Sequence, residues 1–285
     1  MNATYPWLDP QLVALALAED IGRGDVTTQA CVPAMAQARG QIVARQGGII
    51  AGLPLVAAVF RQVDDIVAVE VLVQDGTHVS AGTVLAALHG PARSLLTGER
   101  VALNFLGRLA GIATLTAQCV AAIAGTNAAI VDTRKTTPGL RAVEKYAVRM
   151  GGGQNHRFGL DDGILIKDNH IAASGGITAA VANARAHAHH LLRIEVECDT
   201  SAQVREALAV GVEAILLDNM PVPQLVEAVG MIRASRPATV VEASGGMGTD
   251  PAKLRAVAMT GVDLISIGAL THSVSNLDVA LDFLS

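Results

Sequence analysis

The chain has 285 residues and a formal net charge of −5, and it is 51% hydrophobic with only 2% aromatic residues. A chain of this length can bury a large core, and we expect one large α/β domain plus a smaller one. The acidic balance argues against a nucleic-acid-binding protein, because such proteins carry a broad basic stripe that this sequence lacks.

The first hundred residues predict an α+β domain. Turn-rich sequence separates the last two of its strand patterns. Helices are expected at 10–20, 54–63 and 92–109, and strands at 40–50, 67–73 and 83–88. The apolar stretch 101–125 also contains Asn104, Arg108 and Gln118, which are costly in hydrocarbon. We therefore interpret it as a buried helical region of a soluble protein.

Two further features predict a cytoplasmic location. Residues 1–10 contain no basic region followed by an apolar core, so we expect no secretory signal. Cys31, Cys119 and Cys198 are widely spaced and form no CxxC pair, which argues against disulfides and against a structural zinc site. A reducing compartment is the simple interpretation.

From about Ala128 onward, short apolar runs alternate with amphipathic helical patterns. Strands are expected at 128–131, 164–166, 193–198, 214–217, 238–242 and 263–267, and helices at 140–149, 177–189, 202–210, 223–234 and 251–259. Such alternation indicates a parallel sheet covered by helices. Six units in this length favour a barrel over a doubly wound sheet, and the periodicity leaves its closure open.

Cationic side chains concentrate in three short runs between Val131 and His170, beside the first two of these strands. Two of them are lysines, although the whole chain has only four lysines. The five positions are Arg134, Lys135, His156, Arg157 and Lys167. In a barrel, the carboxyl ends of the strands meet at one mouth. Cations at such a mouth in an acidic chain predict a site for a small polyanion.

Carboxylates and glycines occupy the other strand ends. Glu195, Glu197 and Asp199 alternate along one strand, so they should face one side. Glu197 and Asp218 could hold Mg²⁺ together with substrate phosphates, or could pair with Arg or Lys across the mouth. The backbone N–H groups of Ser244–Gly246 and near Gly268 could bind phosphate, with an ordinary turn as the alternative at Ser244–Gly246. These features together suit a sugar phosphate.

The sequence resembles the quinolinate phosphoribosyltransferase family over nearly its whole length. The similarity includes the three cation-rich runs 132–139, 151–157 and 164–170, together with 19–28, 96–100, 111–114, 215–219 and 268–273. The resemblance implies an N-terminal α/β sandwich domain at 1–112 and an incomplete, TIM-like α/β barrel at 113–270. A C-terminal tail at 271–285 would return to the first domain, and the chains would assemble at least as homodimers.

The resemblance also implies the reaction. Quinolinate and phosphoribosyl pyrophosphate would give nicotinate mononucleotide, pyrophosphate and CO₂ with Mg²⁺, as a step of NAD biosynthesis. Quinolinate would be bound by Arg134, His156, Arg157 and Lys167, with Arg100 supplied by the neighbouring subunit.

Further roles follow from the same resemblance. Lys135, Glu197 and Asp218 would be the catalytic residues that act on phosphoribosyl pyrophosphate, the two carboxylates holding its metal. Ser244, Gly245, Gly246 and Gly268 would bind the 5′-phosphate. The remaining substrate-binding residues would be Thr133, Ile267 and Ala269.

Three other functions stay open at this point. A related branch of proteins, encoded in molybdenum-transport operons, shares the pattern. Lys167 at a strand end could instead form a Schiff base in a barrel aldolase. A non-catalytic nucleotide sensor would keep the phosphate site, but it should not need both carboxylates and five cations.

Overall fold

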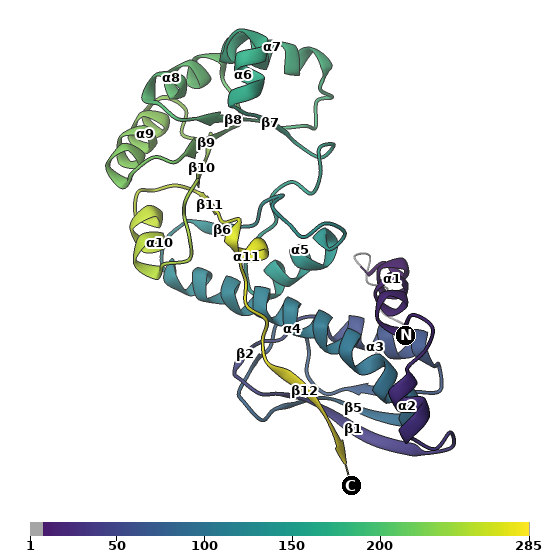
Figure 1. The fold of residues 1–285 in the computed structure, drawn as a ribbon. Coiled ribbons are helices and arrows are strands. Elements are labelled where there is room, and N and C mark those ends of the chain that lie inside the picture. Colours follow the sequence, from purple (N-terminus) through teal and green to yellow (C-terminus); the bar gives the residue numbers. More distant parts are fainter. Residues whose placement is uncertain (1–7, 285) are drawn as a thin grey trace. The chain divides into compact units, whose positions relative to one another are not determined.

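The structure is a computed structural model that describes residues 8–284, so most of the stretch 1–10, on which the absence of a signal was expected, lies outside the described residues. The described chain forms two compact units. The sandwich unit comprises 8–117, 137–152 and 273–284, and the barrel unit comprises 118–136 and 153–272. Figure 1 shows the elements of each.

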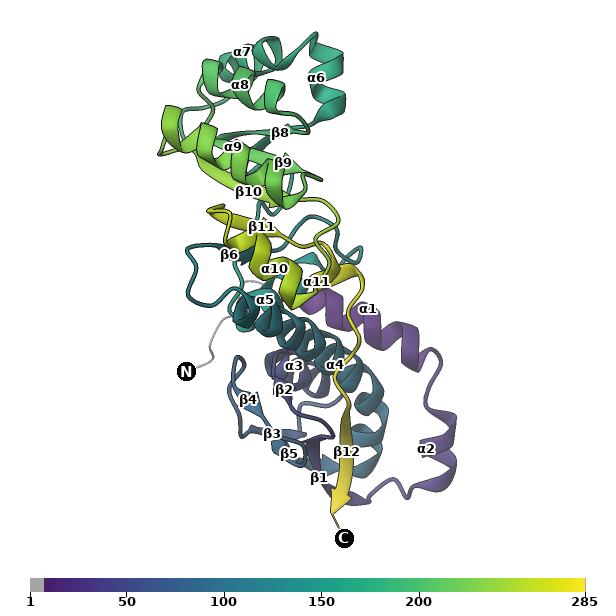
Figure 2. The same cartoon turned by 90° about the vertical axis from the view of Figure 1, so that its left-hand side faces the viewer.

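The sandwich unit is built on a four-stranded antiparallel sheet. Its strand order is β12 (Val279–Leu284), β1 (Gln37–Ala44), β5 (Val84–Pro91) and β3 (Ala68–Val71). The C-terminal strand β12 pairs with β1 from Arg39↔Leu284 to Ala44↔Val279 (Figures 1 and 2). A second small sheet pairs β2 (Gly48–Ile49) with β4 (His78–Val79). The predicted strand 40–50 is therefore two strands, and β12 was not predicted as a strand.

The helices of this unit are α1 (Pro10–Ile21), α2 (Val26–Cys31), α3 (Leu53–Val63), α4 (Ala92–Ala122), which runs on into the barrel unit, and α5 (Arg141–Met150). Leu55 and Phe60 of α3 and Leu95 and Leu106 of α4 are fully buried, so both helices contribute to the core. The predicted helix 92–109 was too short, because α4 continues to Ala122.

The helix α4 is long and apolar enough to cross a membrane by length and composition alone. However, 56% of its most apolar window is buried inside the protein, which is the pattern of a core helix. Arg108 within it forms an ion pair with Glu144 at 2.8 Å, and Glu144 is fully buried. The interpretation of this stretch as a buried helical region is confirmed.

The barrel unit contains a six-stranded parallel sheet. The spatial order is β6 (Ala129–Val131), β11 (Leu264–Ser266), β10 (Val240–Ser244), β9 (Ala214–Asp218), β8 (Ile194–Cys198) and β7 (Ile164–Ile166). Strands that follow one another in the chain are neighbours, except that β6 pairs with β11 instead of β7. This is the order of a βα barrel that stays open between its first two strands.

Helices α6 (Asp168–Ser174), α7 (Ile177–His187), α8 (Ser201–Val210), α9 (Val222–Ser235) and α10 (Pro251–Ala258) alternate with these strands, and α11 (Ala269–His272) follows β11. Figures 1 and 2 show α7 to α10 along the outer side of the curved sheet. The α/β fold with an open barrel is confirmed. Helix α6 was not predicted, because its first residues look like a polar strand end.

Candidate active site

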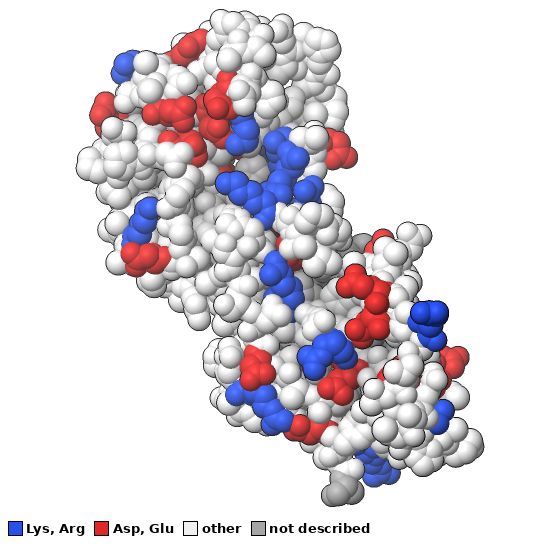
Figure 3. Space-filling model, in the orientation of Figure 1, with Lys and Arg blue, Asp and Glu red and all other residues white. Residues whose placement is uncertain are grey.

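The carboxyl ends of the barrel strands surround a pocket of about 380 Å³. Eleven of the fifteen predicted substrate-binding residues line it: Thr133, Arg134, Lys135, His156, Arg157, Lys167, Glu197, Asp218, Ser244, Gly245 and Gly246. Nine of these residues lie at or just after the carboxyl ends of five of the six strands, so the sheet itself brings them together. His156 and Arg157 lie instead on the irregular segment between α5 and β7. Figure 3 shows Lys and Arg side chains gathered on this unit, with acidic side chains close to them.

Four predicted residues do not line this pocket. Ile267 is buried, and Gly268 and Ala269 follow it at the start of α11. An added Cβ at Gly268 would lie 3.0 Å from Lys135 Cδ, so this glycine makes room for the Lys135 side chain. Arg100 is an exposed residue of α4 in the sandwich unit.

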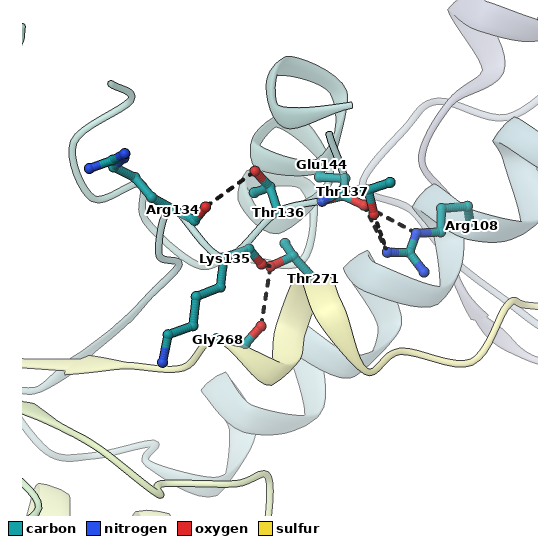
Figure 4. Close-up of polar contacts among 8 residues, drawn as sticks. All are labelled: Arg108, Arg134, Lys135, Thr136, Thr137, Glu144, Gly268 and Thr271. Carbon is teal, nitrogen blue, oxygen red and sulfur yellow. Dashed lines mark hydrogen bonds and ion pairs between the residues drawn. The ribbon is translucent and has the colours of Figure 1, made fainter. Parts of the chain in front are cut away.

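The loop that carries Arg134 and Lys135 is held by hydrogen bonds on both sides (Figure 4). Within the barrel unit, the buried Thr271 hydroxyl donates to the Lys135 carbonyl at 2.8 Å, and the Lys135 N–H donates to Thr133 Oγ1 at 3.0 Å. Two residues after Lys135, in the sandwich unit, Thr137 N–H donates to Glu144 at 3.0 Å, and Arg108 donates to Thr137 Oγ1 at 3.0 Å. The backbone of this loop is thus fixed where its cations enter the pocket.

Lys167 and Glu197 form an ion pair in the pocket. Lys167 Nζ lies 2.5 Å from Glu197 Oε2, and both side chains are partly buried. This is the pairing that the sequence left open as the alternative to a metal role for Glu197. Glu197 and Asp218 both line this pocket, and two carboxylates suit Mg²⁺, which prefers oxygen ligands.

Asn219 follows Asp218 in an unusual conformation. It is the one non-glycine residue with a positive φ (53°) among residues 8–284. Its side chain packs against Gly245, where an added Cβ would lie about 2.4 Å from Asn219 Oδ1, and Gly245 itself has a φ of +81°. Gly245 therefore has both a steric and a conformational reason to be glycine. Strained backbone of this kind concentrates at functional sites.

His156 is surrounded by acidic side chains at the base of the pocket. Its Nε2 lies 3.2 Å from Glu195 Oε2 and 3.3 Å from Glu242 Oε2, and both carboxylates are buried. Burial alone would lower the pKa of His156, but hydrogen bonds to Glu195 and Glu242 raise it to about 10. Burial raises the pKa of Glu195, and His156 partly offsets this. Burial, followed by the charge of Arg134, lowers the pKa of Arg157.

Several residues of the pocket were not among the predicted site residues. Leu165, Leu216, Asn219, Glu242 and Ser266 also line it. Glu242 is the last residue of the expected strand 238–242, and Asn219 follows the expected strand 214–217, but nothing in the sequence indicates that Glu242 meets His156. The conformation of Asn219 likewise depends on its contact with Gly245, which is distant in the chain.

Comparisons with known proteins agree with this architecture. The quinolinate phosphoribosyl transferase N-terminal domain matches residues 25–110, and the C-terminal domain of the same family matches residues 112–282. A Synechocystis protein named probable nicotinate-nucleotide pyrophosphorylase (carboxylating) is 50% identical, and the alignment covers 94% of this chain and 90% of that protein. A Bacillus subtilis protein of the same name is 48% identical over 93% of this chain and 89% of its own length.

Solved structures give the same result. NadC from Streptococcus pyogenes has a TM-score of 0.92 at 40% identity, with 100% of both chains covered. Nicotinate-nucleotide pyrophosphorylase from Ehrlichia chaffeensis has a TM-score of 0.91 at 38% identity, again over 100% of both chains.

Proposed function

The chain belongs to the quinolinate phosphoribosyltransferase family, and from this membership we propose that the pocket at the mouth of its open barrel is the active site. The protein is an enzyme that transfers the phosphoribosyl group of phosphoribosyl pyrophosphate to quinolinate with decarboxylation, in NAD biosynthesis. The observation that carries the assignment of the site is the meeting of cations, two carboxylates and a glycine turn in one pocket.

Quinolinate binds beside the cations of the first two strand ends in this proposal. Arg134, Arg157 and Lys167 supply positive charge to its two carboxylates, and the guanidinium groups can bind them in a bidentate manner. His156 lines the same pocket, with its Nε2 held by the buried carboxylates of Glu195 and Glu242. These groups hold the ring nitrogen in line with the sugar.

Phosphoribosyl pyrophosphate occupies the other side of the pocket. Lys135 contacts its pyrophosphate, and backbone N–H groups of Ser244–Gly246 bind the 5′-phosphate. Glu197 and Asp218 would hold Mg²⁺, whose donor preference they fit, and the ion would neutralise charge on the leaving pyrophosphate. Thr133 fixes the Lys135 backbone through the hydrogen bond described above.

The chemistry needs positioning and charge stabilisation more than a covalent nucleophile. As the bond from C1 to pyrophosphate breaks, the ring nitrogen donates its electron pair to C1. The nitrogen then becomes cationic and stabilises the carbanion left at the adjacent carbon when CO₂ departs. A proton taken up at that carbon completes nicotinate mononucleotide. A pocket that excludes water assists both steps.

A homodimer completes the site in this proposal, with Arg100 of one subunit reaching the quinolinate pocket of the other. The support is the resemblance of the segment 96–100 to the family, together with the exposure of Arg100 on α4. We also place the enzyme in the cytoplasm, where its three free thiols Cys31, Cys119 and Cys198 would remain reduced.

The proposal is tested by release of labelled CO₂ from quinolinate in the presence of phosphoribosyl pyrophosphate and Mg²⁺, with nicotinate as the control substrate. Nicotinate lacks the second carboxylate and would leave cations unpaired in a desolvated site. We expect turnover with nicotinate to be lower by about a thousandfold. Comparable rates with the two substrates would rule out the assignment of the pocket.

The aldolase alternative has weaker support in the structure. A Schiff-base lysine is normally desolvated or placed beside another cation so that it can be a neutral amine. Lys167 instead contacts the Glu197 carboxylate at 2.5 Å. Borohydride treatment with a keto substrate should leave Lys167 unlabelled.

A further inference from the structure

The segment that carries His156 and Arg157 has little regular structure of its own. It runs along the free edge of β6, where the open barrel lacks a neighbouring strand, and makes one parallel bridge between Val131 and Gln154. Two backbone hydrogen bonds accompany this bridge, from Asp132 N–H to the Gln154 carbonyl and from Gln154 N–H to the Ile130 carbonyl. One bridge does not fix the direction of the side chains that follow, so other contacts must do so.

Asp132 provides the first of these contacts. It is fully buried at the end of β6, accepts a hydrogen bond from Asn155 Nδ2 at 2.6 Å, and accepts another from His156 N–H at 2.9 Å. Both of its oxygens therefore hold the backbone and side chains of the segment.

The His156 ring provides the second contact, and it crosses the interior of the barrel. Its Nε2 meets Glu195 on β8 and Glu242 on β10, two strands separated by β9. Glu242 is only 1% exposed, and its Oε2 has no hydrogen-bond partner apart from this ion pair. A buried carboxylate left without any polar partner is costly, so the contact with Nε2 ties the segment firmly to the far strands.

The other ring nitrogen of His156, Nδ1, contacts Arg157. Arg157 N–H donates to His156 Nδ1 at 2.7 Å, and Arg157 Nη1 donates to the Gly163 carbonyl at 3.0 Å. In this arrangement both nitrogens of His156 are engaged by the protein. The ring is thus placed to orient the next residue.

We propose that Glu242 and Glu195, with Asp132, are positioning residues that hold His156 and through it aim Arg157 at quinolinate. The proposal rests on the quinolinate site proposed above. The side chains of Glu242 and Glu195 act through His156, and their removal should weaken quinolinate binding without changing the binding of phosphoribosyl pyrophosphate.

The test uses the full-length enzyme with Glu242→Ala, His156→Ala and the double variant, titrated calorimetrically with quinolinate and separately with phosphoribosyl pyrophosphate. Each single variant should weaken quinolinate binding by about tenfold to a hundredfold. The double variant should lose no more than the His156 variant, because residues that act through one contact are not additive. Glu242→Gln keeps an acceptor and the side-chain shape, and it should restore most of the affinity.

Controls separate this role from general stability. Asp263→Asn removes a carboxylate that pairs with Arg233 at 2.8 Å at the other end of the barrel strands. It should lower the melting temperature and leave the KM for quinolinate unchanged. In the Glu242→Ala variant the KM for quinolinate should rise while kcat and the KM for phosphoribosyl pyrophosphate stay within about threefold.

Three outcomes would overturn the proposal. They are additive losses in the double variant, equal weakening of both substrates, and unchanged quinolinate affinity in a folded Glu242→Ala enzyme. Should Glu242→Ala fail to fold, Glu195→Ala carries the same comparison, because Glu195 holds the same His156 nitrogen. Wild-type CO₂ release from quinolinate tests the proposed function separately, so the two can fail independently.

Discussion

Individual side chains in the pocket divide between the two substrates. We expect Arg157→Ala and Lys167→Ala to weaken quinolinate binding, because their cations face its carboxylates in the proposed complex. Lys135→Ala and Asp218→Ala should instead weaken phosphoribosyl pyrophosphate binding. Loss of one charged contact to a buried ligand costs about 2 to 5 kcal/mol. Calorimetric titration of each variant with each ligand checks this division, which is wrong if both groups of variants show the same ligand preference.

Asp25 stabilises the folded protein in a way that depends on pH. It caps α2 by accepting the Thr28 N–H at 2.9 Å, and hydrogen bonds from Thr28 lower its pKa below 3.8. The folded state therefore favours the ionised form. The stabilisation of the folded state by ionised Asp25 is fully present above the pKa that Asp25 has in the unfolded chain. It is lost as the pH falls through the lower pKa that Asp25 has in the folded protein.

Asp25→Ala should accordingly lower the free energy of unfolding by about 1 kcal/mol at pH 7. The difference from wild type should shrink below about pH 4 as the carboxylate is protonated. Urea unfolding at several pH values measures it. A difference that stays constant down to pH 2 would contradict the proposed charge effect.

Among the elements, α4 depends on two glycines for its packing. Leu277 N–H donates to the Gly107 carbonyl at 2.9 Å, and an added Cβ at Gly111 would overlap the Ser275 carbonyl oxygen. Gly111→Ala should therefore destabilise the protein by more than about 2 kcal/mol, despite the better helix propensity of alanine. Thermal unfolding followed by circular dichroism checks this.

Gly230 in α9 is the matched control, because an added Cβ there meets nothing within 4 Å and its φ is not positive. Gly230→Ala should raise the free energy of unfolding by about 0.5 to 1 kcal/mol. Equal effects of the two substitutions would show that helix propensity, and not the close approach of residues 275–277, decides the outcome at Gly111.

The same elements show what the sequence could and could not predict. The βα rhythm placed the six barrel strands within about two residues, because buried parallel strands are short apolar runs. The same rhythm predicted most of the residues that line the pocket, since the carboxyl ends of parallel barrel strands meet at one mouth. The continuity of α4 as one helix and the strand β12 escaped prediction, because both depend on contacts with distant segments, such as Gly107 with Leu277. The His156–Glu242 pair escaped for the same reason.

At the scale of the whole molecule, the open barrel raises the question of how its site is completed. Within one subunit, β6 lies at the edge of the sheet and makes one further bridge, from Val131 to Gln154. The proposed quinolinate pocket further requires Arg100, an exposed residue of the sandwich unit. If Arg100 comes from the partner, the dimer is obligatory for activity, and the surface around α4 must be shared between subunits.

Subunit mixing tests this arrangement directly. Arg100→Ala and Lys135→Ala chains should each be inactive alone. In a mixed dimer, the chain with intact Lys135 receives the intact Arg100 of its partner, so one site is restored and the other carries both defects. Random mixing in equal amounts makes about half of the dimers mixed, so about a quarter of all sites should regain activity.

The measurement is labelled CO₂ release after exchange, with native mass spectrometry to verify that mixed dimers have formed. The control is the Lys135→Ala chain taken alone through the same exchange treatment. It should stay inactive, because both sites of each dimer lack Lys135. Recovery of about a quarter of the wild-type rate supports the shared site. Verified exchange without recovery would place Arg100 in the site of its own chain or outside the site, and the open barrel would then have to complete its quinolinate pocket from within one subunit.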